Sequence, residues 1–161
     1  MSKPSIVFVH GSFLMPANYA LLCKHLIYDH GYRVVAPSLP SVGAMPGIPS
    51  IAQDVESVRM AVQLEMAMGN DVVVVAHSYG GFVTTNALNG LMKGVALGEN
   101  KVEGQPRVKQ LIHVASMVPF IGMNTGDVMK QADTGVERDE VGNPPGINID
   151  VGSSKPSIAN C

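Results

Sequence analysis

The sequence predicts an α/β fold built on a parallel sheet, and two observations lead to this class. Short apolar runs rich in β-branched residues recur along the chain, as in strands that are buried on both faces of a sheet. Segments with apolar residues at helical spacing alternate with these runs, and right-handed crossovers place such strands side by side. We therefore expect one sheet of about four strands with flanking helices.

The first part of the chain predicts a strand, a helix and a second strand. The run SIVFV at residues 5–9 is the first strand. A helix follows, with apolar positions that begin at Tyr19 and end at Ile27, and Gly31 is expected to end it in a left-handed conformation. Residues 32–36 form the second strand, which leads into a loop rich in proline.

The middle of the chain contains the most regular predicted elements. Ser50 and Gln53 form a capping-box pattern at the start of a helix that ends at Gly69. The apolar positions on one face of this helix are Ile51, Val55, Val58, Val62 and Met66. A valine-rich strand at residues 71–76 then runs without a spacer into the segment 77–81, and a third helix follows that segment.

The last part of the chain changes in character. A fourth strand is predicted at residues 108–117, after an exposed glycine-rich connection at 94–107. Beyond this strand, glycine and proline are frequent and periodic apolar residues are few, so we expect loose chain with a short helix near 127–132. The predicted organisation is a core at residues 1–118 and a poorly ordered segment at residues 119–161.

Composition and charge exclude several classes of function. Of the 161 residues, 46% are hydrophobic and 15% are charged, and the net charge is -2. Without a block of lysines or arginines, we expect binding neither to nucleic acid nor to an anionic membrane. The N-terminus enters a strand at once, which leaves no room for a signal peptide, so we expect a cytoplasmic protein. With Cys23 and Cys161 as the two cysteines, we expect no disulfide framework and no cysteine metal site.

The clearest chemical signal is the segment AHSYGG at residues 76–81. It matches the nucleophile-elbow pattern G-x-S-x-G, except that Ala76 replaces the first glycine. A strand that turns sharply into a helix forces the serine into a strained conformation and requires small neighbours, such as Ala76 and Gly80. The positive end of the new helix would then lie beside the hydroxyl of Ser78. Ser78 is the predicted nucleophile, and a simple helix-capping serine is the alternative interpretation.

A second signal, HGSF at residues 10–13, stands at the end of the first strand. An acyl-transfer enzyme of this plan needs a backbone N–H at that point for its oxyanion hole. We expect Ser12 to supply this donor, with Phe13 as the alternative, and the N–H of Tyr79 to supply the second donor. A strand that ends in His-Gly is by itself weak evidence for an oxyanion hole. The nucleophile-elbow pattern about 65 residues later makes this interpretation more specific.

Four segments together resemble successive landmarks of the α/β-hydrolase superfamily. They are VFVHGS at 7–12, VVAPSLP at 34–40, VVVAHSYGG at 73–81 and LIHVA at 111–115. The chain resembles in particular the compact esterase and hydroxynitrile-lyase-like branch, over about three quarters of its length. The resemblance implies an α/β-hydrolase core that hydrolyses small carboxylic esters through an acyl-serine, needs no metal or organic cofactor, and begins a cap near residues 119–127. It also implies pocket-lining positions for His10, Phe13 and His77.

The chain departs from the family pattern after its fourth strand. In the family the catalytic acid and histidine follow the serine, whereas no histidine follows His113 here, and we expect His113 to be a packed strand residue. An acid without a histidine has no triad role, so none is assigned to Asp127, Asp133, Asp139 or Asp150. Without a base Ser78 keeps its ordinary high pKa, and triad-dependent turnover should be very slow.

Several interpretations stay open on the sequence alone. The chain is either part of a longer hydrolase, truncated before the last strands, or a degenerate stand-alone product, and its ending within cap-like sequence favours the first. A non-catalytic protein that binds a small apolar ester in the same pocket and a hydroxynitrile-lyase-like enzyme are the alternatives to an esterase. The fourth strand would have a free edge that favours self-association.

Overall fold

The computed structural model describes residues 3–47, 50–92, 105–119 and 126–127. The chain divides into two units, Met1–Gly122 and Met123–Cys161, and the fold described below is that of the first. In the second unit, residues 126–127 are helical. The rest of the predicted helix near 127–132, the remaining tail, and most of the connection at 94–107 lie outside the described residues.

Four parallel strands form one sheet in the order β2-β1-β3-β4. They are β1 (Ser5–Val9), β2 (Val34–Val35), β3 (Val72–His77) and β4 (Val108–Val114). The register places Ile6 beside Val34 on one side and beside Val73 on the other. The predicted class, α/β with about four parallel strands and flanking helices, is confirmed.

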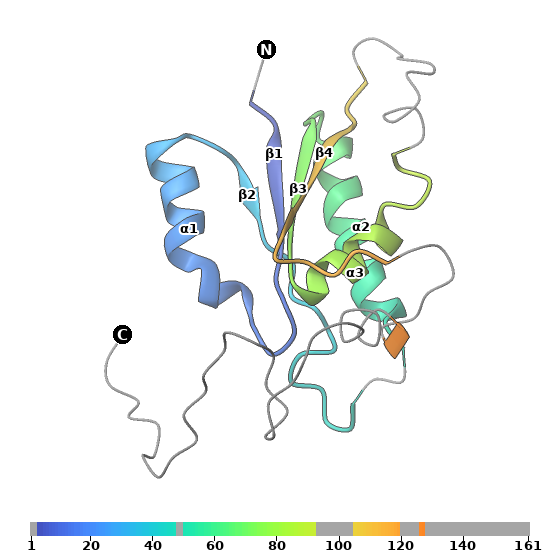
Figure 1. Ribbon diagram of the computed structural model, residues 1–161. Coiled ribbons are helices and arrows are strands. Elements are labelled where there is room, and N and C mark those ends of the chain that lie inside the picture. Colours follow the sequence, from blue (N-terminus) through green and yellow to red (C-terminus); the bar gives the residue numbers. More distant parts are fainter. Residues whose placement is uncertain (1–2, 48–49, 93–104, 120–125, 128–161) are drawn as a thin grey trace, which may run out of the picture. The chain divides into compact units, whose positions relative to one another are not determined.

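Helices lie on both faces of the sheet (Figure 1). The helical segment after β1 comprises a 3-10 turn η1 (Pro16–Tyr19), α1 (Ala20–Lys24) and a π turn η2 (His25–Asp29), and it covers one face. On the opposite face α2 (Ala52–Ala67) and α3 (Tyr79–Ala87) pack against each other and against β1 and β3. Right-handed crossovers place the helices on opposite faces. The chain moves from β1 to β2 in one direction across the sheet, and from β2 past β1 to β3 and β4 in the other, so the connecting helices lie on different sides.

The hydrophobic core lies between the sheet and the pair α2 and α3. Its fully buried aliphatic residues are Val7, Val9, Val58, Val62, Val72, Val74, Val83, Ala87 and Val108. Burial of one valine side chain stabilises a fold by about 1.5–3 kcal/mol, so this layer contributes strongly. On the other face Phe8 packs against Tyr19 with ring centroids 4.6 Å apart. β1 is therefore buried along its whole length, as the apolar run predicted.

Two strands are shorter than predicted, each for a local reason. β2 contains two residues, which pair with Ile6 and Val7, and Pro37 beyond it cannot donate to the ladder. β4 ends at Val114 because Ala115 has a φ of 41°, which interrupts the extended backbone.

The helical segment after β1 also differs from the single regular helix predicted. It changes from 3-10 to α to π winding, and its apolar side chains are incompletely buried. Leu22 and Ile27 remain 45% and 39% exposed. Its end is as predicted, since Gly31 has a φ of 63° and its amide donates to the carbonyl of Ile27.

The end of α2 follows its sequence signal, whereas the start of α2 differs from the predicted capping box. The hydroxyl of Ser50 accepts a hydrogen bond from the amide of Ala52 at 3.0 Å, but α2 begins after Ile51, whose side chain makes no capping hydrogen bond, so the predicted capping box of Ser50 and Gln53 is not found among the described contacts. Gly69 has a φ of 87° and its amide donates to the carbonyl of Met66, as in a Schellman ending.

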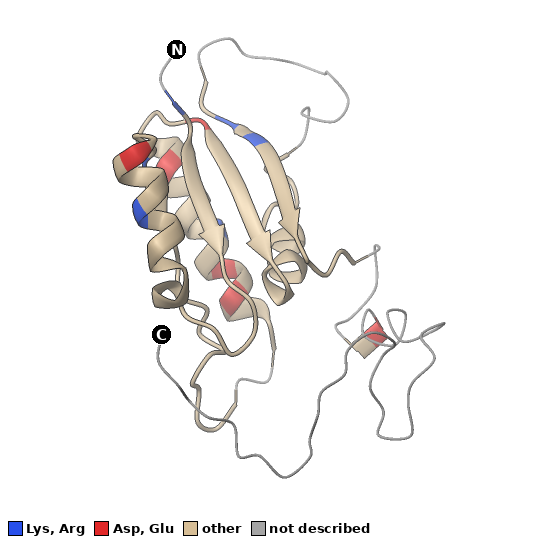
Figure 2. Ribbon diagram, turned by 60° about the vertical axis from the view of Figure 1, so that its left-hand side comes forward, with Lys and Arg blue, Asp and Glu red and all other residues tan. Residues whose placement is uncertain are grey.

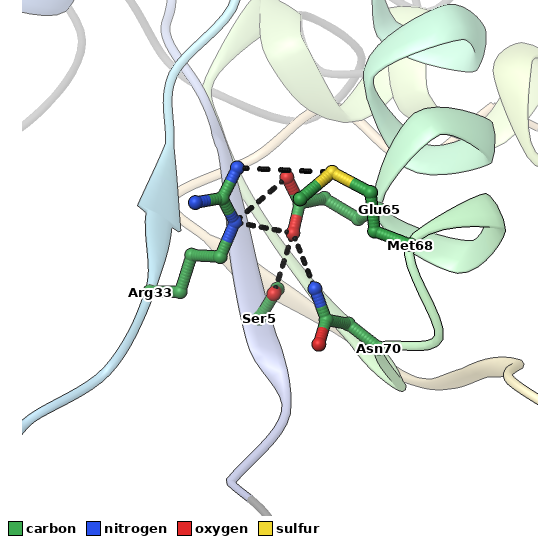
Figure 3. A network of polar contacts seen from close by, with 5 residues as sticks. All are labelled: Ser5, Arg33, Glu65, Met68 and Asn70. Carbon is green, nitrogen blue, oxygen red and sulfur yellow. Dashed lines mark hydrogen bonds and ion pairs between the residues drawn. The ribbon is translucent and has the colours of Figure 1, made fainter.

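Glu65 of α2 is the centre of a polar network at the amino ends of the strands (Figure 3). Its carboxylate is 1% exposed and accepts hydrogen bonds from Ser5 Oγ at 2.6 Å, Arg33 Nε at 2.8 Å and Asn70 Nδ2 at 3.1 Å. The hydrogen bond from Arg33 holds the pKa of Glu65 below its usual value, against the effect of burial. The network joins the start of β1, the approach to β2 and the end of α2.

Charged side chains are nearly absent from the described strands and lie on the helices and at the amino ends of the sheet (Figure 2). There Lys109 Nζ pairs with Asp71 Oδ2 at 2.7 Å, which joins the starts of β3 and β4. The hydrogen bond from Lys109 keeps the pKa of Asp71 low. Over the described ranges, no helix combines the length and the apolar character that crossing a membrane requires.

Candidate active site

The candidate site lies where the strands end. Because all four strands are parallel, the loops that follow them lie together at one edge of the sheet (Figure 1). Ligands of open α/β sheets bind at this carboxyl edge. Ser12 follows β1 and Ser78 follows β3, so the two sequence signals occur at the same edge.

Ser78 joins β3 to α3 as a single residue. β3 ends at His77 and α3 begins at Tyr79. The backbone of Ser78 has a φ of 52° and a ψ of -124°, a conformation that costs a non-glycine residue about 1–3 kcal/mol. The predicted junction of strand, sharp turn and helix is therefore present. The side chain of Ser78 makes no capping hydrogen bond to the described helix α3, so the helix-cap interpretation loses its support.

Two glycines after Ser78 allow the close packing that the turn requires. A Cβ at Gly80 would lie 2.6 Å from the carbonyl oxygen of His10. A Cβ at Gly81 would lie 1.8 Å from Ser116 Oγ, on the segment that continues β4. Side chains at either position would push α3 away from β1 and β4, so the small residues are a steric necessity.

The strained backbone is held by hydrogen bonds on both sides. The carbonyl of Ser78 accepts from the amides of Gly81 and Met117, each at 3.0 Å, and from Ser116 Oγ at 3.2 Å. The amide of Ser78 donates to the carbonyl of Val114 at 3.3 Å. These contacts fasten the turn to the continuation of β4, which explains how an unfavourable conformation persists.

Tyr79 begins α3, where the first amides of a helix have no acceptor within the helix. Its phenol donates a hydrogen bond to Asp54 Oδ2 at 2.8 Å, and Asp54 Oδ1 accepts another from the amide of Ser41 at 2.8 Å. The side chain of Asp54 is completely buried. Burial, together with the neighbouring Asp54 carboxylate, raises the pKa of Tyr79, so the phenol stays protonated and donates.

A cavity of about 440 Å³ lies beside Tyr79. Its lining residues are Ser12, Phe13, Ser41, Val42, Gly43, Ala44, Met45 and Tyr79. The structure thus brings together Ser12, Phe13 and Tyr79, the three residues considered for the oxyanion hole. Most of the lining is carbon, and a lining of this kind suits an apolar group with a few polar contacts.

His10 and His77, which were predicted to line the pocket, have identified partners elsewhere. His10 is 1% exposed, its Nε2 accepts from the amide of Leu39 at 3.2 Å, and its Nδ1 is 2.9 Å from the carbonyl of Gly11. The Nδ1 of His77 is 2.7 Å from the hydroxyl of Tyr19. Neither histidine is among the described residues that line the cavity, and their pocket roles stay predictions.

The other three histidines also have partners. His113 lies in β4 as expected, but it is exposed rather than packed, and its Nδ1 is 3.1 Å from Ser116 Oγ. Partial burial lowers the pKa of His113. On η2, His25 Nδ1 is 2.5 Å from Asp29 Oδ2, and the Nε2 of His30, which follows η2, is 3.1 Å from His25 Nε2. The described histidine contacts therefore do not include the hydroxyl of Ser78.

Sequence reasoning missed Asp54, although a signal was present. Asp54 precedes Val58 by four residues and Val62 by eight, so helical periodicity places it on the buried face of α2. Ser41 and Tyr19 could not be found in this way. Their contacts reach Asp54 and His77 across 13 and 58 residues of sequence, and no local pattern encodes them.

Comparison with known proteins agrees with the fold. Residues 6–146 match the Alpha/beta hydrolase family. Probable hydrolase R7 from a Phoma species is 32% identical over 164 residues, which cover 99% of this chain and 61% of the relative. Alpha/beta hydrolase nvfD from Aspergillus novofumigatus is 31% identical over 138 residues, which cover 85% of this chain and 53% of the relative. The chain thus spans little more than half the length of these curated relatives.

Solved structures of tomato Methylketone Synthase I share the architecture. Its complex with 2-tridecanone has a TM-score of 0.56 and 17% identity, and covers 84% of this chain and 48% of the solved chain. The complex of a histidine-to-alanine variant with beta-ketoheptanoate has a TM-score of 0.58 and 16% identity. This match covers 82% of the present chain and 47% of the solved chain. At these identities the likeness concerns the fold alone. The family match over residues 6–146, together with the two relatives, shows that this chain belongs to the α/β hydrolase family.

Proposed function

We propose that this chain carries the nucleophile of a serine hydrolase that acts on small carboxylic esters, with an acyl-serine intermediate at Ser78. The observation that carries the proposal is the strained backbone of Ser78 between β3 and α3. Backbone strain of this size persists in folded proteins mainly at functional sites, where the surrounding structure holds it in place. Here four hydrogen bonds to the backbone of Ser78 provide that support.

The amides of Tyr79 and Ser12 are the proposed donors of the oxyanion hole, with Phe13 as the alternative to Ser12. The amide of Tyr79 belongs to the first turn of α3, where the helix dipole favours negative charge. Both residues border the cavity that would hold the substrate. A negative charge that develops on the carbonyl oxygen of the ester would therefore be stabilised by backbone donors.

The cavity supports a substrate with a small apolar group. Its volume of about 440 Å³ lies within the range of roughly 300–1,000 Å³ that is usual for small-molecule pockets. Val42, Ala44 and Met45 supply carbon surface, whereas the lining contains no charged residue among those described. This lining favours an uncharged ester over an ionised ligand.

The reaction needs a base that the described histidines do not supply. A base takes the Oγ proton as Ser78 attacks the ester carbonyl, the alcohol leaves with that proton, and water then releases the acid from the acyl-serine. In the family order the acid and histidine follow the serine. We therefore place the base in the part of the family architecture beyond the length that this chain shares with its relatives.

Labelling with a fluorophosphonate and measurement of the intact mass test the proposal. We expect one label per chain, slow to form, that disappears in Ser78→Ala. Ser12→Ala is the matched control, because it keeps the backbone N–H and should still be labelled. A label on another residue would contradict the proposal. A folded chain that takes no label but binds esters saturably, with Ser78→Ala unchanged, would support the non-catalytic binding protein instead.

A further inference from the structure

A buried carboxylate that the proposed reaction does not use connects the elbow to the wall of the cavity. Asp54 is completely buried on α2, and its two oxygens accept hydrogen bonds from the phenol of Tyr79 and the amide of Ser41, both at 2.8 Å. Tyr79 and Ser41 both line the cavity. One side chain of α2 therefore contacts two separate walls of the candidate site.

Core packing alone does not explain an aspartate at this position. Asp54 lies on the same face of α2 as Val58 and Val62, which are fully buried, so an aliphatic residue would satisfy the hydrophobic pattern. A buried carboxylate is costly unless hydrogen bonds compensate for the lost water. Both oxygens of Asp54 have such bonds, and an apolar replacement would leave the Ser41 amide and the Tyr79 hydroxyl without this acceptor.

We propose that Asp54 is a positioning residue of the candidate site. Its hydrogen bond to Tyr79 anchors the side chain of the residue whose amide is the proposed oxyanion donor. The carbonyl of Ser78 is anchored independently to Ser116 and Met117, so the first turn of α3 is held from two sides. Its second bond holds Ser41, and thereby the wall of the cavity at residues 41–45. The catalytic meaning of this inference rests on the proposed function.

The same helix offers a matched control. Glu65 is also a buried carboxylate of α2 with several hydrogen bonds, but its partners Ser5, Arg33 and Asn70 lie at the amino ends of the strands (Figure 3). Loss of either carboxylate should lower the overall stability. Only loss of Asp54 should disturb the candidate site locally.

Hydrogen exchange, followed by mass spectrometry of peptides that cover residues 41–45 and 78–82, tests the positioning directly. We expect Asp54→Ala to raise exchange in both segments by about tenfold or more, the effect of losing hydrogen bonds to a charged group. Tyr79→Phe removes only the hydrogen bond between Tyr79 and Asp54, so it should raise exchange in residues 78–82 alone. This variant tests the positioning role even if Asp54→Ala folds poorly. Glu65→Gln should change neither segment relative to the rest of the chain. Unchanged exchange in 78–82 for Tyr79→Phe, or an equal change for Glu65→Gln, would overturn the inference.

The rate of fluorophosphonate labelling separates this inference from the proposed function. We expect Asp54→Ala and Tyr79→Phe to slow labelling of Ser78 by about tenfold or more, and Glu65→Gln to leave the rate close to that of the parent chain. If the parent chain is labelled and folded Tyr79→Phe reacts at the same rate, the positioning role is wrong while the proposed nucleophile stands. If the folded parent chain takes no label, Ser78 is not activated in this chain, and the exchange data alone decide whether Asp54 orders the two segments.

Discussion

Replacing Ser78 with glycine should make the protein more stable than replacing it with alanine. Both substitutions remove the hydroxyl, which makes no capping hydrogen bond to α3. They differ in how the new residue tolerates the backbone, with its φ of 52° and ψ of -124°. Glycine adopts such a conformation without a Cβ clash, whereas alanine retains the strain.

The expected size follows from two opposing effects. The strained conformation costs a residue with a Cβ about 1–3 kcal/mol, and glycine removes that cost. Glycine loses about 0.5–1 kcal/mol more backbone entropy than alanine when the chain folds. The difference leaves Ser78→Gly more stable than Ser78→Ala by about 1 kcal/mol.

Urea denaturation of the two variants measures this difference. For a small protein, about 1 kcal/mol corresponds to a shift of roughly 0.3–1 M in the unfolding midpoint. Gln63, exposed inside α2, provides the matched pair, where Gln63→Gly should be less stable than Gln63→Ala by about 1 kcal/mol. If Ser78→Gly were also the less stable of its pair, the turn would hold no strain and the structural argument for Ser78 would fail.

Three further outcomes can be checked by denaturation and alkylation. Gly80→Ala should destabilise by about 1–3 kcal/mol in urea, because its Cβ would lie 2.6 Å from a carbonyl oxygen, whereas Gly47→Ala, with nothing within 4 Å, should be nearly neutral. The fold lowers the pKa of Glu65 below its ordinary value of 4.5, so the ionised carboxylate stabilises the fold above that pH, and this stabilisation is lost as the pH falls through the lowered pKa. Glu65→Gln should therefore flatten the acid side of a curve of unfolding free energy against pH, whereas Glu56→Gln, at an exposed position, should not. Burial raises the pKa of Cys23, so peptide mapping should find it alkylated by iodoacetamide more slowly in the folded than in the unfolded chain.

Much of the fold could be predicted because its signals are local. β1 and β3 are continuous apolar runs, as expected of strands in the interior of a parallel sheet, and the end of α2 is marked by Gly69. The extent of β2 was not predictable from its own residues. β2 pairs with Ile6 and Val7 alone, although β1 has five residues, so its length is a tertiary property.

In the candidate site, too, the local features could be predicted from the sequence and the tertiary contacts could not. The pattern around Ser78 encodes a strained turn, and the backbone angles of that turn agree with it. The role of Asp54 was not recognised, because a carboxylate on an apolar helical face is interpretable only when its partners are known. Those partners are an amide from the loop after β2 and a phenol at the start of α3, which the fold brings together.

Detection of an acyl-serine would test the assignment of Ser78 as the nucleophile. The purified chain is incubated with p-nitrophenyl acetate, quenched in acid, digested and mapped by mass spectrometry, alongside Ser78→Ala. We expect one acetyl group on Ser78, with release of p-nitrophenol that is lost in the variant. An acetyl group on a different residue, or p-nitrophenol release that is the same in Ser78→Ala, would contradict the assignment of Ser78 as the nucleophile.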